Sequence, residues 1–258
     1  MTETLAQLLH DAQGLLLAGF IVFLRISGAM AMLPAFGEQV VPMRVRLVLA
    51  FAFTAVVLPA AMPAVSRIAS PFPLPVWLIG EALIGLLIGM VLRSFVFCLQ
   101  IAGTMAAQAT SLSQLFGGTA GEPQPAVGQL LMFAGLAVAV HLGLHVRFAE
   151  LFVQSYDALP PGHLPDPDLV RGWGLSGVVR AFSLAFSLAA PFVIAGLIYN
   201  VALGAINRAM PQLMVAFVGA PALTAGGLVL LAIALPTGLM LWHGAFEAFL
   251  ANPFTVPR

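Results

Sequence analysis

Long apolar runs separated by short polar stretches dominate the hydrophobic pattern of this chain. A helix needs about 20 apolar residues to cross the ~30 Å hydrocarbon core of a bilayer. The runs near or above that length are Ala12–Gly37, Leu47–Ser66, Ile68–Leu92, Ser94–Gly121, Pro123–Val146, Ala181–Asn207 and Ala209–Phe246. The last run is long enough for a hairpin or a long broken helix. We therefore expect an all-α polytopic membrane protein with six spans, to which the last run could add a seventh.

Prolines lie in or at the ends of these apolar runs. Each proline removes a backbone donor and tends to kink or end its helix. In lipid, the freed carbonyl groups need partners inside protein. We expect proline-broken helices and helical hairpins that pack mainly against other protein. The prolines concerned are Pro34, Pro59, Pro63, Pro191, Pro211, Pro221 and Pro236.

The composition agrees with a membrane protein. Hydrophobic residues make up 61% of the chain, charged residues 8%, and the formal net charge is zero. Soluble domains have about 25% charged residues, so this chain has too few polar side chains to cover a soluble surface. The absence of net positive charge argues against a nucleic-acid partner.

The most hydrophilic segment is Arg147–Trp173, which is rich in proline and aspartate. This composition predicts a non-helical loop. The loop would divide the chain into an N-terminal helical half (1–146) and a C-terminal helical hairpin half (174–258), with the loop at 147–173 between them.

Two charges, Arg25 and Glu81, interrupt apolar runs. A charge inside a membrane costs several kcal/mol unless it finds a partner. The pair could serve an ion or proton path, or could make structural contacts within the protein. We favour the structural role, because one acid and one base neutralise each other and no second acid supports a relay. Gly85 and Gly89 follow Glu81 on the same helix face, at the spacing that lets helix backbones touch.

A polar, uncharged stripe is formed by Gln100, Thr104, Gln108 and Ser111, at intervals of four, four and three residues. The stripe either bonds to neighbouring helices or lines a wet path, and the sequence leaves both open. It leads into Gln114–Gly128, which is rich in glycine and proline. Non-helical backbone at membrane depth persists only when it is buried in protein or lines a cavity.

Catalytic and metal-binding patterns are weak. His141 and His145 have the spacing of one helical turn, but the acid of a zinc hydrolase motif is missing nearby. We therefore expect no enzyme, no metal and no cofactor.

The stretch Gly204–Pro221 places Asn207, Arg208, Pro211 and Gln212 between two apolar runs. We interpret it as a helix–kink–helix corner whose polar groups contact the chain's own loops or partner subunits. The alternative is a short loop with Arg208 in water. The two interpretations differ in the burial of Arg208.

Together these segments resemble the flagellar biosynthetic protein FliR family over nearly the whole chain, virulence type III secretion members included. The matching stretches, in order, are "FLRISGAMAMLPAFGEQVVPMRVRLVLA", "GEALIGLLIGMVL", "AGTMAAQATSLSQLFGG", "LHVRFAELFVQSYDALPPG" and "LGAINRAMPQLMVAFVGAP". The most specific residues are Arg25, Pro34, Pro42, Arg44, Arg46, Glu81, Gly85, Gly89, Ala102, Gly103, His145, Leu159, Pro160, Asn207, Arg208, Pro211 and Gln212.

The resemblance implies a subunit of the flagellar type III export gate in the bacterial inner membrane, within the basal body. Such members assemble with FliP and FliQ, beside other export-apparatus membrane proteins, into a closed helical assembly around a pore. Their broken hairpins lie largely above the bilayer plane. Unfolded flagellar proteins are threaded through the pore, and other parts of the machine supply the energy.

The resemblance also implies that a mid-chain loop, here about Ala106–Glu122, plugs the closed pore. Many members have Asp-Pro just after the polar helix, whereas this chain has Glu122-Pro123 further on. The role therefore transfers to the region, with the polar stripe and these loop residues as candidates: Gln114, Leu115, Phe116, Gly117 and Gly118.

Two alternatives stay open. One is the equivalent subunit of a virulence type III secretion system. The other, from a different class, is a small secondary transporter, which would explain broken helices and an intramembrane Glu81. Transporters usually show paired halves, and this sequence has no convincing internal repeat.

Overall fold

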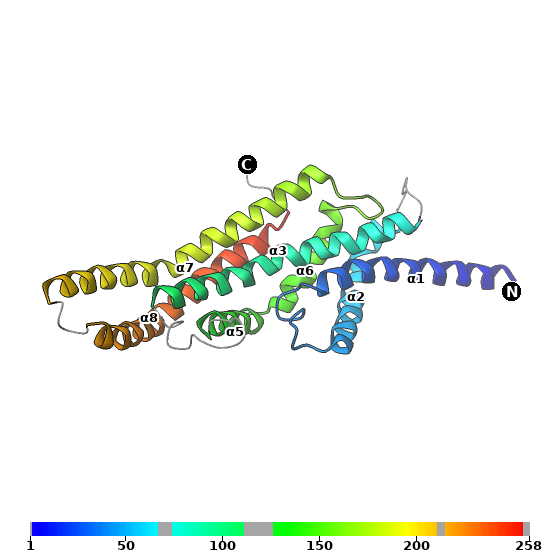
Figure 1. Cartoon of the computed structure of the whole chain (residues 1–258). Helices are drawn as coiled ribbons and strands as arrows, with labels where there is room; N and C mark the ends of the chain where they lie inside the picture. Colours follow the sequence, from blue (N-terminus) through cyan, green and yellow to red (C-terminus); the bar gives the residue numbers. More distant parts are fainter. Residues whose placement is uncertain (1, 67–73, 111–125, 211–214, 255–258) are drawn as a thin grey trace. The chain divides into compact units, whose positions relative to one another are not determined.

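The computed structural model describes residues 2–66, 74–110, 126–210 and 215–254, and every regular element in those ranges is an α-helix (Figure 1). The expected all-α fold is thereby confirmed. The helices are α1 (Thr2–Met30), α2 (Met43–Val65), α3 (Leu74–Ala109), α5 (Ala126–His141), α6 (Leu144–Ala158), α7 (Pro167–Ala209) and α8 (Val215–Ala251).

Five of the described helices contain segments long and apolar enough to cross a membrane, and α5 with α6 forms a broken pair that could add a sixth span. The total of six, in which α5 and α6 together count as one span, agrees with the six expected spans. The five segments are Gln7–Met30, Met43–Val65, Val76–Ala109, Val170–Ala209 and Pro221–Ala251.

The division of spans differs from the expectation at α3. Two spans were expected, at Ile68–Leu92 and Ser94–Gly121, but one helix runs from Leu74 to Ala109. Arg93 separates the two apolar runs in the sequence, and its guanidinium pairs with the Glu38 carboxylate in a partly buried contact. Because the charge is paired and no proline intervenes, the backbone continues as a helix.

The predicted non-helical loop at 147–173 is wrong for most of its length. Helix α6 occupies Leu144–Ala158 and α7 begins at Pro167, so only a short connection between them is non-helical. The sequence of α6 is amphipathic, and its buried side chains recur at helical spacing. They are Leu144, Phe148, Leu151, Phe152, Ser155 and Tyr156. Pro167 is tolerated because the first position of a helix needs no backbone donor.

Several prolines lie within helices rather than at their ends. Pro59 and Pro63 are inside α2, and Pro191 is inside α7. Helix α8 contains Pro221 and Pro236 and continues to Ala251. From Val215 onward the last apolar run therefore forms one long helix rather than a hairpin, and its segment Pro221–Ala251 is one of the candidate spans.

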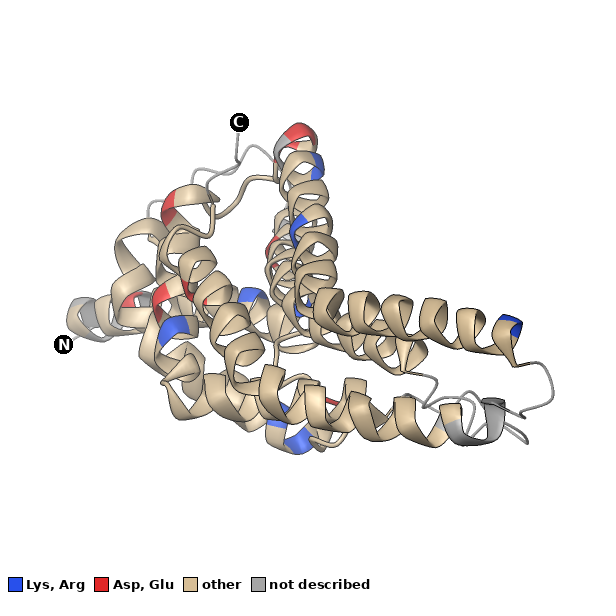
Figure 2. Ribbon diagram, turned by 90° about the vertical axis from the view of Figure 1, so that its left-hand side faces the viewer, with Lys and Arg blue, Asp and Glu red and all other residues tan. Residues whose placement is uncertain are grey.

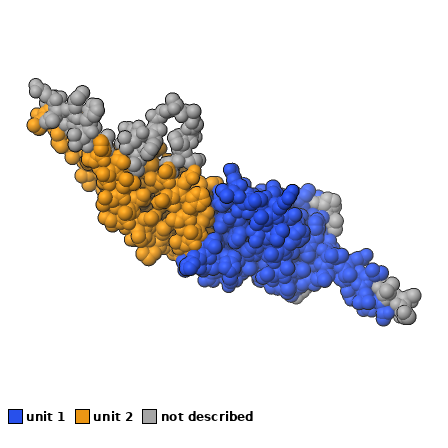
Figure 3. All heavy atoms as spheres, turned by 90° about the horizontal axis from the view of Figure 1, so that it is seen from below, with its two compact units in different colours: residues 1–94, 140–178, 249–258 blue, residues 95–139, 179–248 orange. Residues whose placement is uncertain are grey.

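The chain forms two compact units (Figure 3). Each is assembled from segments far apart in the sequence, so the units do not follow the predicted halves. Unit 1 contains residues 1–94, 140–178 and 249–258, and unit 2 contains residues 95–139 and 179–248.

In unit 1, α2 packs against both α1 and α6. Phe53 of α2 makes edge contacts with Phe36, which follows α1, and with Phe152 of α6. The start of α7 is attached to the C-terminal segment, because the Trp173 indole Nε1–H donates to the Pro253 carbonyl at 2.8 Å.

In unit 2, the second half of α3 packs with α5, α7 and α8. Trp242 is fully buried, and its indole Nε1–H donates to the Phe95 carbonyl at 2.8 Å. A side chain at Gly103 would place its Cβ 2.2 Å from the Gly128 Cα, so α3 and α5 touch through their backbones. Small residues thus permit close packing here.

Charged side chains are sparse along the helices (Figure 2). Many large apolar side chains are instead exposed, most of all on α7 and also on α8. Surfaces of this kind face lipid or other protein chains. Examples are Leu197, Ile198, Val201, Val229 and Ile233.

Candidate functional site

Arg25 of α1 and Glu81 of α3 meet in the interior of unit 1. The Arg25 Nε–H donates to Glu81 Oε2 at 2.8 Å, and neither side chain has any exposed surface. The intraprotein contact that the sequence favoured for these charges is therefore observed, and the two residues are each other's partner.

The rest of the Arg25 guanidinium faces the C-terminal end of α6. Its Nη1 donates to the Ser155 carbonyl at 3.0 Å and to Ser155 Oγ at 3.1 Å. Its Nη2 donates to the Leu159 carbonyl at 2.9 Å. The last carbonyls of a helix carry partial negative charge, so this end of α6 favours a cation. The Arg25 Cζ also lies 4.0 Å from the centroid of the Tyr156 ring, within cation–π range.

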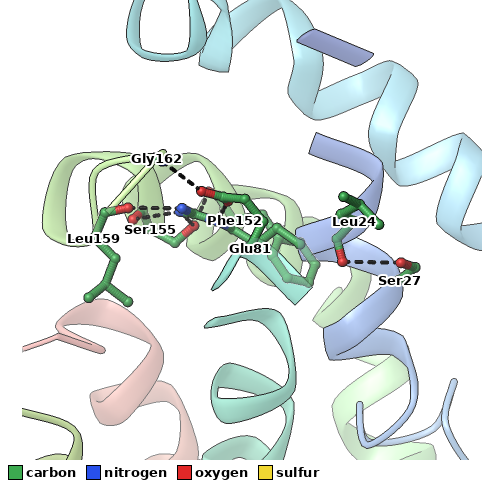
Figure 4. Close-up of polar contacts among 8 residues, drawn as sticks. Leu24, Ser27, Glu81, Phe152, Ser155, Leu159 and Gly162 are labelled. Atoms are coloured by element: carbon green, nitrogen blue, oxygen red, sulfur yellow. Dashed lines mark hydrogen bonds and ion pairs between the residues drawn. The ribbon is translucent and has the colours of Figure 1, made fainter. Parts of the chain in front are cut away.

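The Glu81 carboxylate extends the same network to the turn after α6. Its Oε1 accepts the Gly162 backbone N–H at 3.1 Å, while the Ser155 hydroxyl donates to the Phe152 carbonyl at 2.7 Å (Figure 4). The network therefore connects α1, α3, α6 and the following turn. A buried ion pair is stable only when hydrogen bonds satisfy the rest of both groups, as they do here.

Glycines bring α1 and α3 close enough for this contact. A Cβ on Gly85 would lie 1.8 Å from the Arg25 carbonyl oxygen, and one on Gly89 would lie 2.5 Å from the Ala29 carbonyl oxygen. From the other side, a Cβ on Gly28 would lie 2.3 Å from the Ala82 carbonyl oxygen. Each of these distances is far below van der Waals contact, so only glycine fits. The predicted packing face around Gly85 and Gly89 is where the two backbones touch.

The geometry favours a structural role for the ion pair. The acid and the base are directly bonded and fully enclosed, and their other hydrogen-bond partners among the described residues are backbone groups and the Ser155 hydroxyl. The described residues also contain no group of three or more His, Cys, Asp or Glu side chains that could hold a metal ion. His141 and His145 do not share one helix, because Gly143, with φ 91°, separates α5 from α6.

The polar stripe lies on the second half of α3. Gln100 is half-buried and its Nε2 lies 2.9 Å from Met132 Sδ, while Thr104 Oγ1 donates to the Gln100 carbonyl of its own helix at 2.8 Å. Gln108 is exposed. Ser111 falls outside the described residues. Among the described residues of the stripe, Gln100 and Thr104 thus contact neighbouring groups of the protein, whereas the Gln108 side chain is exposed.

The candidate plug residues Gln114, Leu115, Phe116, Gly117 and Gly118 also lie outside the described residues. The predicted break at Gln114–Gly128 ends no later than Ala126, where α5 begins. Its C-terminal boundary was therefore placed too late, because Ala126–Gly128 is helical. The plug stays a prediction.

Asn207 and Arg208 occupy the last turn of α7 and are exposed. Pro211 and Gln212 fall outside the described residues. An arginine in the last turn suits the negative end of the helix dipole. Within this chain Arg208 is thus accessible, and a contact with a partner subunit stays a prediction.

Sequence reasoning noted Leu159 as part of the family resemblance but did not assign it, or the other residues that complete the network, to the buried ion pair. The other residues are Ser155, Tyr156 and Gly162. The apolar period of α6 was the available signal, since it marks a buried helix that ends before a proline pair. A helix that ends inside protein leaves carbonyl groups in need of donors. A buried arginine on another helix was the natural candidate to donate hydrogen bonds to those carbonyl groups.

Comparison with known proteins gives a consistent result. Residues 16–249 match the family model described as bacterial export proteins, family 1. The chain is 32% identical over 233 residues to flagellar biosynthetic protein FliR of Caulobacter vibrioides, covering 89% of this chain and 93% of that protein. It is 27% identical to the protein of the same name in Aquifex aeolicus, covering 88% of each. The Bacillus subtilis protein of that name is 26% identical, with 89% of this chain and 90% of that protein covered.

Proposed function

Because the chain belongs to the flagellar biosynthetic protein FliR family, the bacterial export proteins of family 1, we propose that it is a subunit of the flagellar type III protein export gate. The observation that carries the proposal is the match over residues 16–249, nearly the whole chain. The match also extends over most of the length of the relatives named flagellar biosynthetic protein FliR.

In this proposal the subunit lies in the bacterial inner membrane within the flagellar basal body, and assembles with FliP and FliQ around a pore. Unfolded flagellar proteins pass through that pore. The exposed apolar side chains of α7 and α8 support an assembled state, since such a surface needs lipid or protein to cover it. The uncharged stripe at Gln100, Thr104 and Gln108 suits a path for chemically varied peptides, because a charged wall would retain some and repel others.

Three regions carry the assembly and gating roles in this proposal. The Arg25–Glu81 network, with Gly85 and Gly89, fixes the packing of unit 1. The segment at about 106–122 plugs the closed pore, and the corner at Asn207, Arg208, Pro211 and Gln212 contacts partner subunits.

The proposed subunit threads substrates with energy supplied elsewhere and performs no catalysis of its own. A virulence export role is less favoured, because the similar relatives are named for flagellar biosynthesis. A secondary transporter is less favoured because Glu81 is occupied by Arg25 and by the Gly162 N–H.

Copurification tests the proposal. The tagged full-length chain, extracted in mild detergent from its own cells, should bring FliP and FliQ with it in a complex of defined size. A stable monomer that exchanges a small solute when placed in liposomes would instead support the transporter and overturn the gate.

A further inference from the structure

The C-terminal end of α3 is held between α7 and α8, within unit 2. A Cβ on Gly196 of α7 would lie 2.5 Å from the Ala109 carbonyl oxygen. A Cβ on Gly227 of α8 would lie 2.6 Å from Thr110 Cγ2 and 2.8 Å from Thr110 Cβ. These distances are too short for van der Waals contact, which needs about 3.5–4.0 Å between carbon atoms. The end of α3 is thus fixed from two sides by helices that only glycine lets so close.

The Thr110 side chain is held at both of its branches. It is buried, and its Oγ1 donates to the Ala106 carbonyl at 2.8 Å. The Thr110 backbone N–H donates to the same carbonyl at 3.1 Å. The hydroxyl therefore satisfies a carbonyl at the end of α3, while the methyl group faces Gly227. Rotation of this β-branched side chain would lose both contacts.

The start of α5 is held by the same helix. A Cβ on Gly103 of α3 would lie 2.2 Å from the Gly128 Cα and 3.0 Å from the Val127 carbonyl carbon. Gly103 and Thr110 are about two helical turns, or about 10 Å, apart. The chain therefore enters and leaves the connection 111–125, which lies outside the described residues, at two points fixed on one helix.

Other glycines of α7 and α8 have no such neighbour. Gly204 of α7 and Gly226 of α8 are exposed, and a Cβ on either would meet nothing within 4 Å. Gly226 and Gly227 are adjacent in the sequence, yet only Gly227 is buried against Thr110. The close contact therefore belongs to particular positions and is not a general property of glycine in these helices.

We propose that Gly103, Gly196 and Gly227 are positioning residues for the proposed plug, because they hold both of its ends in register with α3. The inference rests on the proposed function, since it assigns a role to the two ends of the plug segment. A methyl group on Gly227 would have to move Thr110 by about 1 Å to restore van der Waals distance. A shift of that size displaces one end of the plug in a complex that still assembles.

Ion uptake by cells that express the assembled complex tests this role. Gly227→Ala should raise uptake above the wild-type level, with the same partner subunits copurifying in the same amount. Gly226→Ala, at the neighbouring position, should leave uptake unchanged. In α7, Gly196→Ala and Gly204→Ala form the same kind of pair. A purely structural role would reduce assembly or thermal stability and would not open a leak in an intact complex.

An exchange of side chains tests the contact itself. Thr110→Gly combined with Gly227→Ala removes the atoms that the new Cβ would meet, and should return uptake to the wild-type level. Thr110→Ser keeps a hydroxyl for the Ala106 carbonyl but loses the methyl group, so it loosens the contact without a clash. Thr110→Ser should also raise uptake, and it provides the test if Gly227→Ala prevents assembly.

Deletion within Leu115–Gly121, measured in the same assay, separates failure of the positioning role from failure of the plug. If the deletion leaks while assembled Gly227→Ala and Thr110→Ser complexes stay sealed, the positioning role is overturned and the plug stands. A Gly226→Ala complex that leaks as much as Gly227→Ala also overturns it, as does a leak that persists in the exchange variant. If the deletion leaves an intact complex sealed, the plug assignment fails and the positioning role fails with it.

Discussion

At the scale of single residues, the charge pair predicted to be structural gains its stability from groups that the sequence did not reveal. The Arg25 guanidinium donates hydrogen bonds both to the Glu81 carboxylate and to the last carbonyl groups of α6. Hydropathy identifies a charge inside an apolar run and so predicts that a partner exists. It cannot identify backbone partners, because Ser155 and Leu159 contribute carbonyl groups that every residue has.

Removing one charge should destabilise the protein strongly. We expect Glu81→Gln to lower the free energy of unfolding by about 3–5 kcal/mol, because Arg25 is left buried without its counter-charge. Replacing both residues, as Arg25→Met with Glu81→Leu, should cost less than the two single changes added together. Thermal unfolding of the purified protein in detergent measures each effect.

The exposed pair Arg171–Asp168 provides the control, since Arg171→Gln should change stability little. A Glu81→Gln protein as stable as the wild type would show that the pair does not hold unit 1 together.

Tyr156 allows a finer test, because its ring covers Arg25 while its hydroxyl has no hydrogen-bond partner among the described residues. Tyr156→Phe keeps the ring and removes an unsatisfied buried group, so stability should hold or rise. Tyr156→Leu loses the cation–π contact, and stability should fall by about 1–2 kcal/mol. A large loss in the Phe variant would mean that the hydroxyl is bonded after all.

At the scale of helices, the apolar runs predicted the class of fold well but the element boundaries less well. The break expected between Leu92 and Ser94 is absent because Arg93 is paired with Glu38. Helix α6 was interpreted as loop because its polar residues were weighed without its apolar period. Both errors arise because charge and proline content describe a segment, whereas tertiary partners decide whether it stays helical.

The contact between α1 and α3 yields a test with a matched control in α1. Gly85→Ala should separate the helices and disrupt folding, because its new Cβ would lie 1.8 Å from the Arg25 carbonyl oxygen. Gly14→Ala has nothing within 4 Å of its Cβ and should be neutral or stabilising by up to about 1 kcal/mol. The yield of folded protein on size-exclusion chromatography compares the two.

Equal yields for the two alanine variants would contradict the close crossing of α1 and α3. A loss of folded protein in both variants would show that these helices tolerate substitutions poorly in general. The effect of Gly85→Ala could then not be attributed to the close contact with Arg25.

At the scale of the whole molecule, the sequence predicted a membrane protein of proline-broken helices, and its resemblance to the FliR family is confirmed by the comparisons. The two compact units were not predicted. Each is built from distant segments, and hydropathy along the chain contains no information on which segments meet. The residues of the pore and plug stay predictions for the same reason, since their proposed roles depend on an assembly with other chains.

The plug predicts a change in membrane permeability. Deleting a few residues within Leu115–Gly121 should leave the assembly intact but make the inner membrane leak ions or small molecules, because nothing then seals the resting pore. Ion uptake by cells that express the assembled deletion variant measures the leak. Unchanged permeability in an intact assembly would contradict the plug assignment.

The export role itself is tested most directly by deleting the gene and assaying flagellar proteins in the culture medium. Without the protein, flagellar building blocks should stay inside the cell and no filaments should form. The wild-type gene and Gly14→Ala should restore export, whereas Glu81→Gln should not. A deletion strain that keeps normal filaments and normal secretion of flagellar proteins would contradict the proposed export gate.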